Sequence, residues 1–169
     1  MDEAMMSDTY VECMVKKRTS VLMQFLKILT IMLAVVFILL GCILWPALII
    51  GILMAVAAYF VYLNTDLEYE YLYLDKEISV DKVMAKSKRK KVAQYDVQRM
   101  EILAPMNSYR LDGYKNRKVK TVDYSSGVAG QPDTRYVMYY EGDLKIIFEP
   151  NAKMVQAIKN VVPRKVFTD

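Results

Sequence analysis

The sequence contains no histidine among its 169 residues, and this absence restricts the chemistry open to it. Histidine is the commonest general base near neutral pH and the commonest metal ligand. Its absence excludes the histidine-dependent serine and cysteine triads and most zinc and haem sites. No convergent set of acid and base groups stands out among the remaining residues. We therefore expect a protein that is not an enzyme and has no cofactor, with an enzyme working without histidine as a remote alternative.

Glycine, proline and cysteine are also scarce, at 6, 5 and 2 residues. An apolar fraction of 54 % with so little glycine and proline excludes a collagen-like or disordered chain. Cys13 and Cys42 are too few for a disulfide framework. The length allows one ordinary domain with an attachment.

Charge is missing from one long stretch, since no charged residue lies between Lys27 and Asp66. The apolar run from Ile28 to Leu63 has 36 residues. As one helix it would measure about 54 Å, far more than the roughly 30 Å of a bilayer core. Because proline suits the first turn of a helix, Pro46 favours a break there. The run predicts two membrane crossings, at about Val21–Leu44 and Pro46–Leu63, within a hairpin over 20–63.

The flanks of the hairpin predict its orientation. Basic residues precede the first crossing and follow the second, whereas the turn carries no charge. The positive-inside rule then predicts that both termini lie in the cytoplasm. The chain is expected to cross the cell membrane twice. A hairpin that dips into one leaflet is the alternative.

Small residues recur on the second helix at spacings of four and three, which allow close helix packing. We interpret them as contacts within the hairpin, against Ala34 and Gly41, with a dimer interface as the alternative. These helix-packing residues are Ala47, Gly51, Ala55 and Ala58.

The remainder, residues 64–169, has the alternation of a β domain in which turn residues recur every eight to twelve positions. Seven antiparallel strands are predicted, at 67–74, 78–85, 91–95, 97–104, 118–125, 135–140 and 144–149. A helix at 151–162 follows, with Asn151 as its N-cap and an apolar stripe that includes Met154 and Ile158. This order predicts an α+β, mainly β fold: a helical hairpin, then a seven-stranded barrel like that of pleckstrin-homology (PH) domains, closed by a C-terminal helix.

The segment before the hairpin, residues 1–19, also alternates, with Thr9, Val11, Cys13 and Val15 on one side. It is either a short cytoplasmic strand that pairs with an edge of the β domain or a loose tail.

Two acidic residues, Glu68 and Glu70, alternate with Tyr69 and Tyr71 in the first strand of the β domain. Their spacing allows a calcium site, but calcium needs six or more oxygen ligands. We interpret the two carboxylates as solvating a face of the sheet or meeting nearby lysines, and we assign no metal site.

Basic residues form two clusters after the hairpin, and they are the best functional lead. A net charge of +4 is too small for a nucleic-acid-binding protein. Juxtamembrane basic residues are instead attracted to anionic lipid. The candidate lipid-binding residues are Lys86, Lys88, Arg89, Lys90, Lys91, Arg110, Lys115, Arg117, Lys118 and Lys120.

Several segments together resemble bacterial membrane-anchored PH-like proteins, and more closely a family of small clostridial-type membrane proteins. The resemblance covers most of the chain from about Ser7 and implies a Gram-positive membrane protein, but no activity. It is carried by the hairpin and by Glu68–Tyr71, Ser87–Lys91, Asp112–Arg117, Val122–Gly127 and Phe148–Asn151.

Two functions are compatible with these patterns. The first is a protein-interaction or scaffolding module at the cytoplasmic face, using the loop Asn107–Lys120 and sheet edges. The second is a domain that senses anionic lipid through the basic clusters. The expected partners are membrane lipids and a protein or a second copy of the chain, but no nucleic acid.

Overall fold

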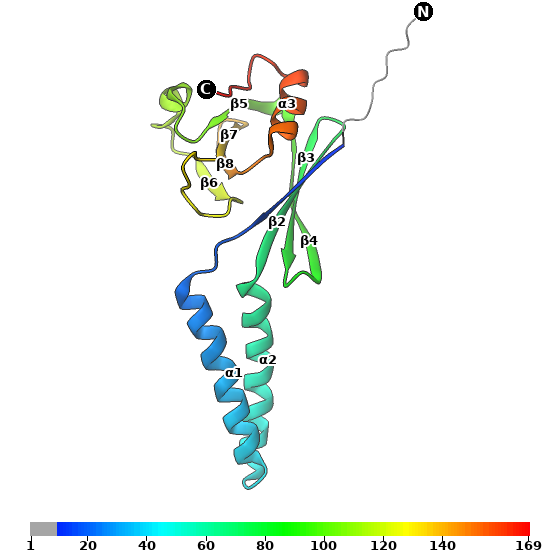
Figure 1. The fold of residues 1–169 in the computed structure, drawn as a ribbon, viewed down its shortest axis with the longest axis vertical. Helices are drawn as coiled ribbons and strands as arrows, with labels where there is room; N and C mark the ends of the chain where they lie inside the picture. Colours follow the sequence, from blue (N-terminus) through cyan, green and yellow to red (C-terminus); the bar gives the residue numbers. More distant parts are fainter. Residues whose placement is uncertain (1–9) are drawn as a thin grey trace, which may run out of the picture. The chain divides into compact units, whose positions relative to one another are not determined.

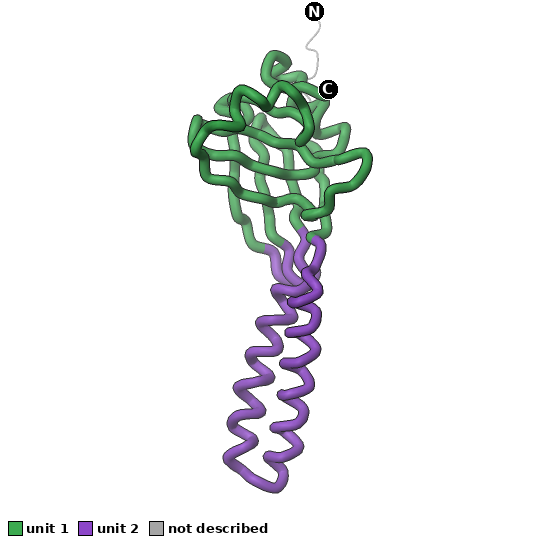
Figure 2. Tube along the Cα trace, turned by 90° about the vertical axis from the view of Figure 1, so that its left-hand side faces the viewer, with its two compact units in different colours: residues 1–17, 69–82, 90–169 green, residues 18–68, 83–89 purple. Residues whose placement is uncertain are grey.

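The computed structural model describes residues 10–169, so the first nine residues of the predicted segment 1–19 lie outside the described part. The chain divides into two compact units (Figure 2). Unit 2 comprises residues 18–68 and 83–89, and unit 1 comprises the rest. Figure 1 shows the two helices of unit 2 and the strands and third helix that follow.

Unit 2 is dominated by two apolar helices, α1 (Val21–Gly41) and α2 (Trp45–Thr65). Pro46 lies in the first turn of α2, where its missing N–H costs nothing. The predicted break at Pro46 is therefore present, and only Cys42–Leu44 separate the helices.

The two helices pack along shielded positions spaced alternately by four and three residues, which is the spacing of a left-handed helix pair. In α2, Gly51 and Ala58 are buried while Ala47 and Ala55 are partly buried. A Cβ on Gly51 would lie 2.9 Å from the backbone nitrogen of Ile38 in α1. The small residues thus let the two backbones approach within the hairpin, and the dimer interface stays a prediction. The shielded positions of α1 are Met23, Lys27, Thr30, Ala34, Phe37 and Gly41.

Eight strands form two four-stranded sheets. The first has the order β1-β2-β3-β4 and the second the order β5-β7-β8-β6. The strands of the first sheet are β1 (Val11–Lys16), β2 (Leu67–Leu74), β3 (Glu77–Met84) and β4 (Lys88–Asp96). Those of the second are β5 (Met100–Pro105), β6 (Lys120–Asp123), β7 (Tyr136–Tyr140) and β8 (Leu144–Phe148).

The predicted seven-stranded antiparallel barrel is therefore wrong in three respects. The described residues form eight strands, because β1 joins β2 in the first sheet. The sheets do not close, because the chain leaves the first sheet at the short helix η1 (Val97–Arg99) and β5 pairs with β7 instead of β4. In addition, β6 pairs with β8 in parallel. The long loop after β6 carries the chain past β8, and the β7–β8 hairpin then places β8 between β7 and β6.

The core of unit 1 lies between residues of both sheets and the C-terminal helix α3 (Ala152–Val161). The side chain of Asn151 accepts a hydrogen bond from the Met154 N–H and so caps this expected helix. Met154 and Ile158 are fully buried. Alternate residues of β7 and β8 face a second, smaller cluster that the helix η2 (Tyr109–Tyr114) helps to cover.

Tyrosines fill much of the main core. The Tyr71 hydroxyl donates a hydrogen bond of 2.6 Å to the Tyr124 carbonyl, and its ring meets the Phe148 ring edge-on. Burial raises the pKa of Tyr71 far above that of a solvated phenol. Because hydrogen bonding satisfies the hydroxyl, this polar group is tolerated inside the core.

The hairpin packing predicts the effect of a larger side chain at Gly51. Gly51→Val would force the α1 backbone away and should destabilise the hairpin by about 1–3 kcal/mol. Ala57→Val, at an exposed position of the same helix, is the matched control and should be close to neutral. Loss of helical circular dichroism during titration of mixed micelles with dodecyl sulfate measures both. Equal midpoints for the two variants would contradict the close approach.

The buried Tyr71 hydroxyl predicts a loss of stability at alkaline pH. Its folded-state pKa lies above the unfolded value near 10, so its stabilisation is complete below pH 10 and is lost as the pH rises further. By pH 11 we expect a loss of about 1.4 kcal/mol from this group. Tyr71→Phe should be less stable at pH 7, by about 1–3 kcal/mol, because the Tyr124 carbonyl loses its donor. Its dependence on pH above 10 should be correspondingly weaker.

Denaturant unfolding in detergent between pH 7 and 11, followed by near-ultraviolet circular dichroism, tests this expectation. Tyr109→Phe is the control, since Tyr109 is 64 % exposed. If wild type and Tyr71→Phe lose stability in parallel above pH 10, the Tyr71 hydroxyl is not the group that causes the alkaline loss of stability.

Candidate functional site

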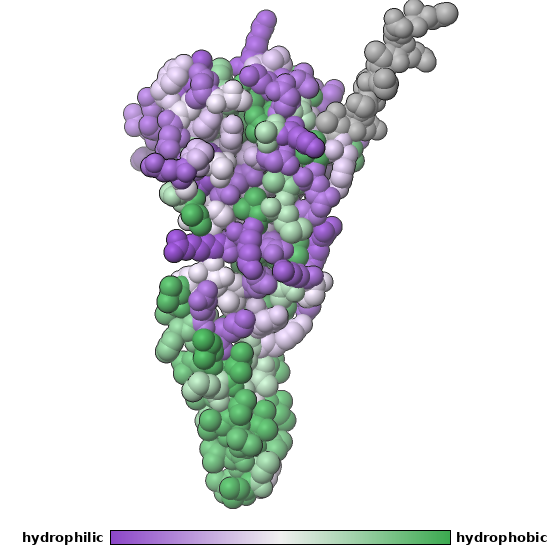
Figure 3. Space-filling view, in the orientation of Figure 1, coloured by the Kyte–Doolittle hydropathy of each residue, from purple (hydrophilic) through white to green (hydrophobic). Residues whose placement is uncertain are grey.

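The hairpin ends at a sharp boundary between apolar and polar residues. Each helix has 21 residues, or about 31 Å, and both are long and apolar enough to cross a membrane by length and composition. Their surface in Figure 3 is almost uniformly apolar. Trp45 stands at one end of α2 and Tyr59 and Tyr62 near the other, as in the aromatic belts of membrane helices.

The turn between β3 and β4 is held at the polar end of α2, within unit 2. Asp66 caps α2, and its carbonyl accepts a hydrogen bond of 2.7 Å from the Ala85 N–H. Ala85 and Lys86 have φ angles of 47° and 54°, so the chain reverses tightly after this contact. Lys86 in this turn and the first two residues of β4, Lys88 and Arg89, are referred to below as the basic tip.

Two lysines lie over tyrosine rings of α2. The Lys88 ammonium is 5.2 Å from the centre of the Tyr59 ring, and the Lys27 ammonium is 4.6 Å from that of Tyr62. Residues three apart are neighbours on a helix surface, so both tyrosines belong to one side of α2. Attraction between a cation and the face of an aromatic ring is worth roughly 0.5–2 kcal/mol, more when water is excluded. Lys88 therefore ties the basic tip to the last two turns of α2.

The charge of unit 2 is unbalanced. It holds five basic residues and two acidic ones, Asp66 and Glu68. Glu68 is only 9 % exposed and contributes little negative charge at the surface. Within residues 10–169, no carboxylate forms an ion pair with Lys86 or Lys88. The positive charges of Lys86 and Lys88 are thus available to an external anion.

The second predicted basic cluster lies in unit 1, where three of its members meet carboxylates. Arg110 pairs with Asp169 at 3.3 Å, Lys115 with Asp112 at 2.6 Å, and Arg117 with Glu101 at 2.7 Å. Of the ten candidate lipid-binding residues, three thus belong to unit 2 and seven to unit 1. Lys90 and Lys91 also belong to unit 1, as do Lys118 and Lys120.

Aromatic and basic side chains of unit 1 line a cleft of about 320 Å³. The Arg110 guanidinium lies 4.2 Å from the centre of the Phe167 ring and 5.1 Å from that of Tyr109. The same arginine lowers the pKa of the Asp169 carboxyl through their hydrogen bond. The cleft already accommodates one carboxylate of its own chain at its edge. Its lining is Glu101, Ile102, Tyr109, Arg110, Tyr114, Arg164 and Phe167.

The expected solvated carboxylate face on β2 is not present. Glu70 is 1 % exposed and Glu68 is 9 % exposed, so both carboxyl groups are buried. Alternation showed that they face away from Tyr69 and Tyr71, but not that this second face is also covered. Among residues 10–169, no group of three or more acidic or cysteine side chains is placed to hold a metal ion.

Sequence reasoning missed Tyr59 and Tyr62 as partners of the lysines. A usable signal was present, since these tyrosines interrupt the aliphatic run four residues and one residue before its end at Leu63. Nothing in the local pattern, however, indicated that a turn more than twenty residues later would reach them.

Comparison with known proteins gives one match. The model of a family described as "Bacterial PH-like domain (DUF6106)" matches residues 7–168. No curated protein and no solved structure gives a significant match.

Proposed function

Because the chain belongs to the bacterial PH-like domain family DUF6106, we propose that it is a membrane-anchored, non-enzymatic module whose basic tip contacts anionic lipid. PH-like domains are generally non-enzymatic. In this proposal the hairpin crosses the membrane twice and both termini lie in the cytoplasm. The uncharged turn at Cys42–Leu44 and the basic residues at the opposite end of the hairpin support this orientation.

The hydrogen bond from Ala85 to the Asp66 carbonyl is the observation that carries the proposal. If α2 crosses the membrane, the residue that caps it lies in the headgroup layer. The turn bonded to this residue must then lie in or beside the same layer. Lys86, Lys88 and Arg89 are thus brought to lipid phosphates by a contact within unit 2.

The energy of this interaction indicates its role. A basic residue near an anionic surface contributes about 1 kcal/mol, so Lys86 and Lys88 alone contribute about 2 kcal/mol, or roughly thirtyfold in an equilibrium. Anchoring does not need this contribution, because a transmembrane hairpin inserts almost irreversibly. The tip therefore controls how closely the β3–β4 turn contacts the surface, and this contact varies with the density of anionic lipid.

Neutralising the basic tip should remove this dependence on anionic lipid. An environment-sensitive fluorophore is attached at Ser87→Cys in a full-length chain that carries Cys13→Ala and Cys42→Ala. In nanodiscs of phosphatidylcholine, adding 30 % phosphatidylglycerol should shift the emission to shorter wavelength. Raising the salt from 0.1 to 1 M should reverse the shift, because the screening length falls from about 10 to 3 Å. Lys86→Gln/Lys88→Gln/Arg89→Gln should show no shift.

The control removes the same number of charges from the other cluster. Lys115→Gln/Lys118→Gln/Lys120→Gln should respond to phosphatidylglycerol like the parent chain. An equal loss of response in both triple variants, or a shift that persists in the tip variant, would overturn the tip as the lipid-contacting surface.

A protein partner is the second candidate function, and the cleft of unit 1 favours it. The loop Asn107–Lys120 supplies two residues to this cleft, the exposed Tyr109 and Arg110, whose guanidinium pairs with Asp169. Arg164 adds another positive charge. The Asp169 carboxylate on Arg110 indicates the chemistry of the partner, namely an acidic peptide segment with an aromatic neighbour. The Phe167 N–H donates a hydrogen bond to the Leu103 carbonyl in β5. A peptide strand that adds to the edge of a sheet makes backbone hydrogen bonds of the same kind.

A peptide with the sequence of residues 165–169 tests this second function. Its fluorescence polarisation should show weak binding to the full-length chain, because the chain's own Asp169 competes for Arg110. Asp169→Ala should bind the peptide more tightly, by about tenfold, since the loss of a charged hydrogen bond frees the arginine. Arg110→Gln should not bind it. Equal binding by all three chains would contradict the cleft as a docking site.

A further inference from the structure

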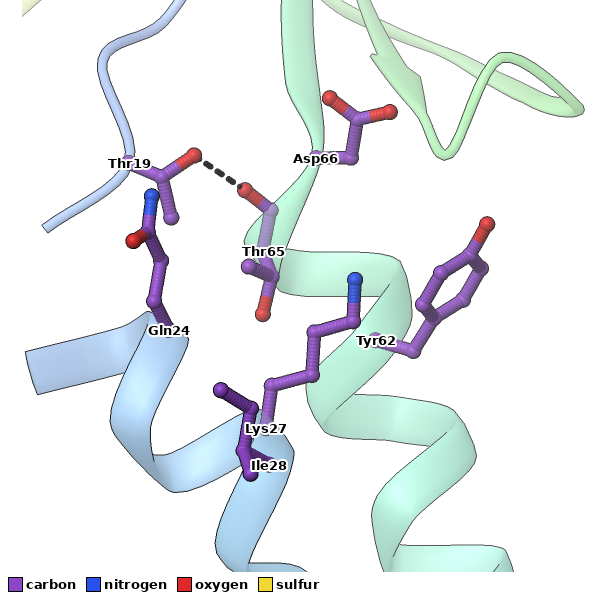
Figure 4. Close-up of a pocket in the computed structure, with 7 residues that line it drawn as sticks. All are labelled: Thr19, Gln24, Lys27, Ile28, Tyr62, Thr65 and Asp66. Atoms are coloured by element: carbon purple, nitrogen blue, oxygen red, sulfur yellow. Dashed lines mark hydrogen bonds between the residues drawn. The ribbon is translucent and has the colours of Figure 1, made fainter. Parts of the chain in front are cut away.

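A pocket of about 360 Å³ lies at the end of the hairpin where α1 begins and α2 ends (Figure 4). All its lining residues belong to unit 2. The volume lies at the lower end of the range for sites that hold small ligands. The residues that line it are Thr19, Gln24, Lys27, Ile28, Tyr62, Thr65 and Asp66.

Lys27 gives the pocket its charge. It is the only charged residue between Arg18 and Asp66, and it occupies a shielded position of α1 that faces α2. Figure 4 shows its ammonium directed toward the last turn of α2, between Thr65 and Tyr62. Within residues 10–169, no acceptor lies at hydrogen-bond distance from this ammonium and no carboxylate pairs with it. Three N–H donors therefore remain for a ligand.

The two threonines of the pocket already use their hydroxyl protons. Thr19 Oγ1 donates to the Thr65 carbonyl at 2.8 Å, and Thr65 Oγ1 donates to the Val61 carbonyl at 2.7 Å. Gln24 contributes an amide with two N–H donors, and in Figure 4 it extends toward Thr19. The side-chain donors available to an anion are thus the Lys27 ammonium and the Gln24 amide, beside the Tyr62 hydroxyl.

The walls of the pocket differ in polarity. Ile28 and the Tyr62 ring form an apolar side that faces the hairpin, whereas Asp66 lies just beyond the last turn of α2. A carboxylate can accept several hydrogen bonds at once, so Asp66, which already interacts with another group of the chain, can also accept one from a ligand. An occupant that fits has an acyl part, a phosphate, and a hydrogen-bond donor beyond the phosphate, in that order.

We propose that this pocket binds one glycerophospholipid whose headgroup carries an O–H or N–H donor, such as a glycerol or ethanolamine headgroup. Lys27 and Gln24 bind the phosphate, Asp66 accepts from the headgroup donor, and the start of an acyl chain lies along Ile28 and Tyr62. A choline headgroup has no such donor and binds less well. The inference depends on the proposed membrane anchoring, but it concerns a pocket separate from the basic tip.

Native mass spectrometry of the full-length chain, released from nanodiscs with equal amounts of phosphatidylglycerol and phosphatidylcholine, tests the proposal. The wild type should retain one phosphatidylglycerol. Lys27→Gln should lower the retained fraction about tenfold, because a charged hydrogen bond to phosphate is lost, and Lys27→Arg should restore it. Asp66→Ala should reduce the preference for phosphatidylglycerol over phosphatidylcholine, because the acceptor for the headgroup hydroxyl is lost. Helical circular dichroism shows whether each variant folds.

Three outcomes would overturn the proposal. They are equal retention by wild type and Lys27→Gln, equal retention of the two lipids by the wild type, and thermal stabilisation by inorganic phosphate alone that matches the stabilisation by lipid. The tip variant Lys86→Gln/Lys88→Gln/Arg89→Gln separates this site from the proposed function. It should keep the bound lipid while losing the response to surface charge, so either proposal can fail without the other.

Discussion

The carbonyl groups at the end of α2 are the feature on which the rest of unit 2 depends. The last carbonyls of any helix lack partners within the helix, and near hydrocarbon an unsatisfied carbonyl costs several kcal/mol. Here Thr65 accepts from the Thr19 hydroxyl and Asp66 accepts from the Ala85 N–H. The hydrogen bonds that satisfy the last carbonyls of α2 therefore hold both Thr19, which precedes α1, and the β3–β4 turn next to the end of α2. The same contacts create the pocket and present the basic tip, so both candidate sites are consequences of ending one apolar helix.

The pairing of charges, more than their number, distinguishes the two basic clusters. Both look alike in sequence, but Arg110, Lys115 and Arg117 each meet a carboxylate, and two of them also lie over aromatic rings. To contact lipid phosphate, such a residue would first have to leave its partner. Lys86 and Lys88 have no competing carboxylate among the described residues. Lipid contact is therefore the better function for the tip, and recognition of a defined acidic segment the better one for the cleft.

The features that depend on local composition were predicted correctly from the sequence. The features that depend on which distant segments pair with one another were not. A charge-free run with a central Pro46 indicates two apolar helices, and the Asn151 cap with its apolar stripe indicates α3, because both signals lie within the element itself. Alternation identifies strands but not their neighbours. It therefore gave neither the parallel pairing of β6 with β8 nor the open edges of the two sheets. For the same reason it predicted a solvated Glu70, since burial of a second sheet face depends on what packs there.

The basic tip and the pocket differ in what they can detect. Exposed lysines respond to the average charge of a surface, and salt within a Debye length of about 10 Å weakens that response. Lys27 lies between two helices, where water and salt have less access, and its phosphate would be held by directional hydrogen bonds. This ammonium is partly shielded and lies over the Tyr62 ring, and a bound phosphate would add charge-assisted hydrogen bonds to that contact. Occupation of the pocket would therefore stabilise the helix ends from which the tip is held, and lipid identity at the pocket would determine how firmly the tip is presented to lipid charge.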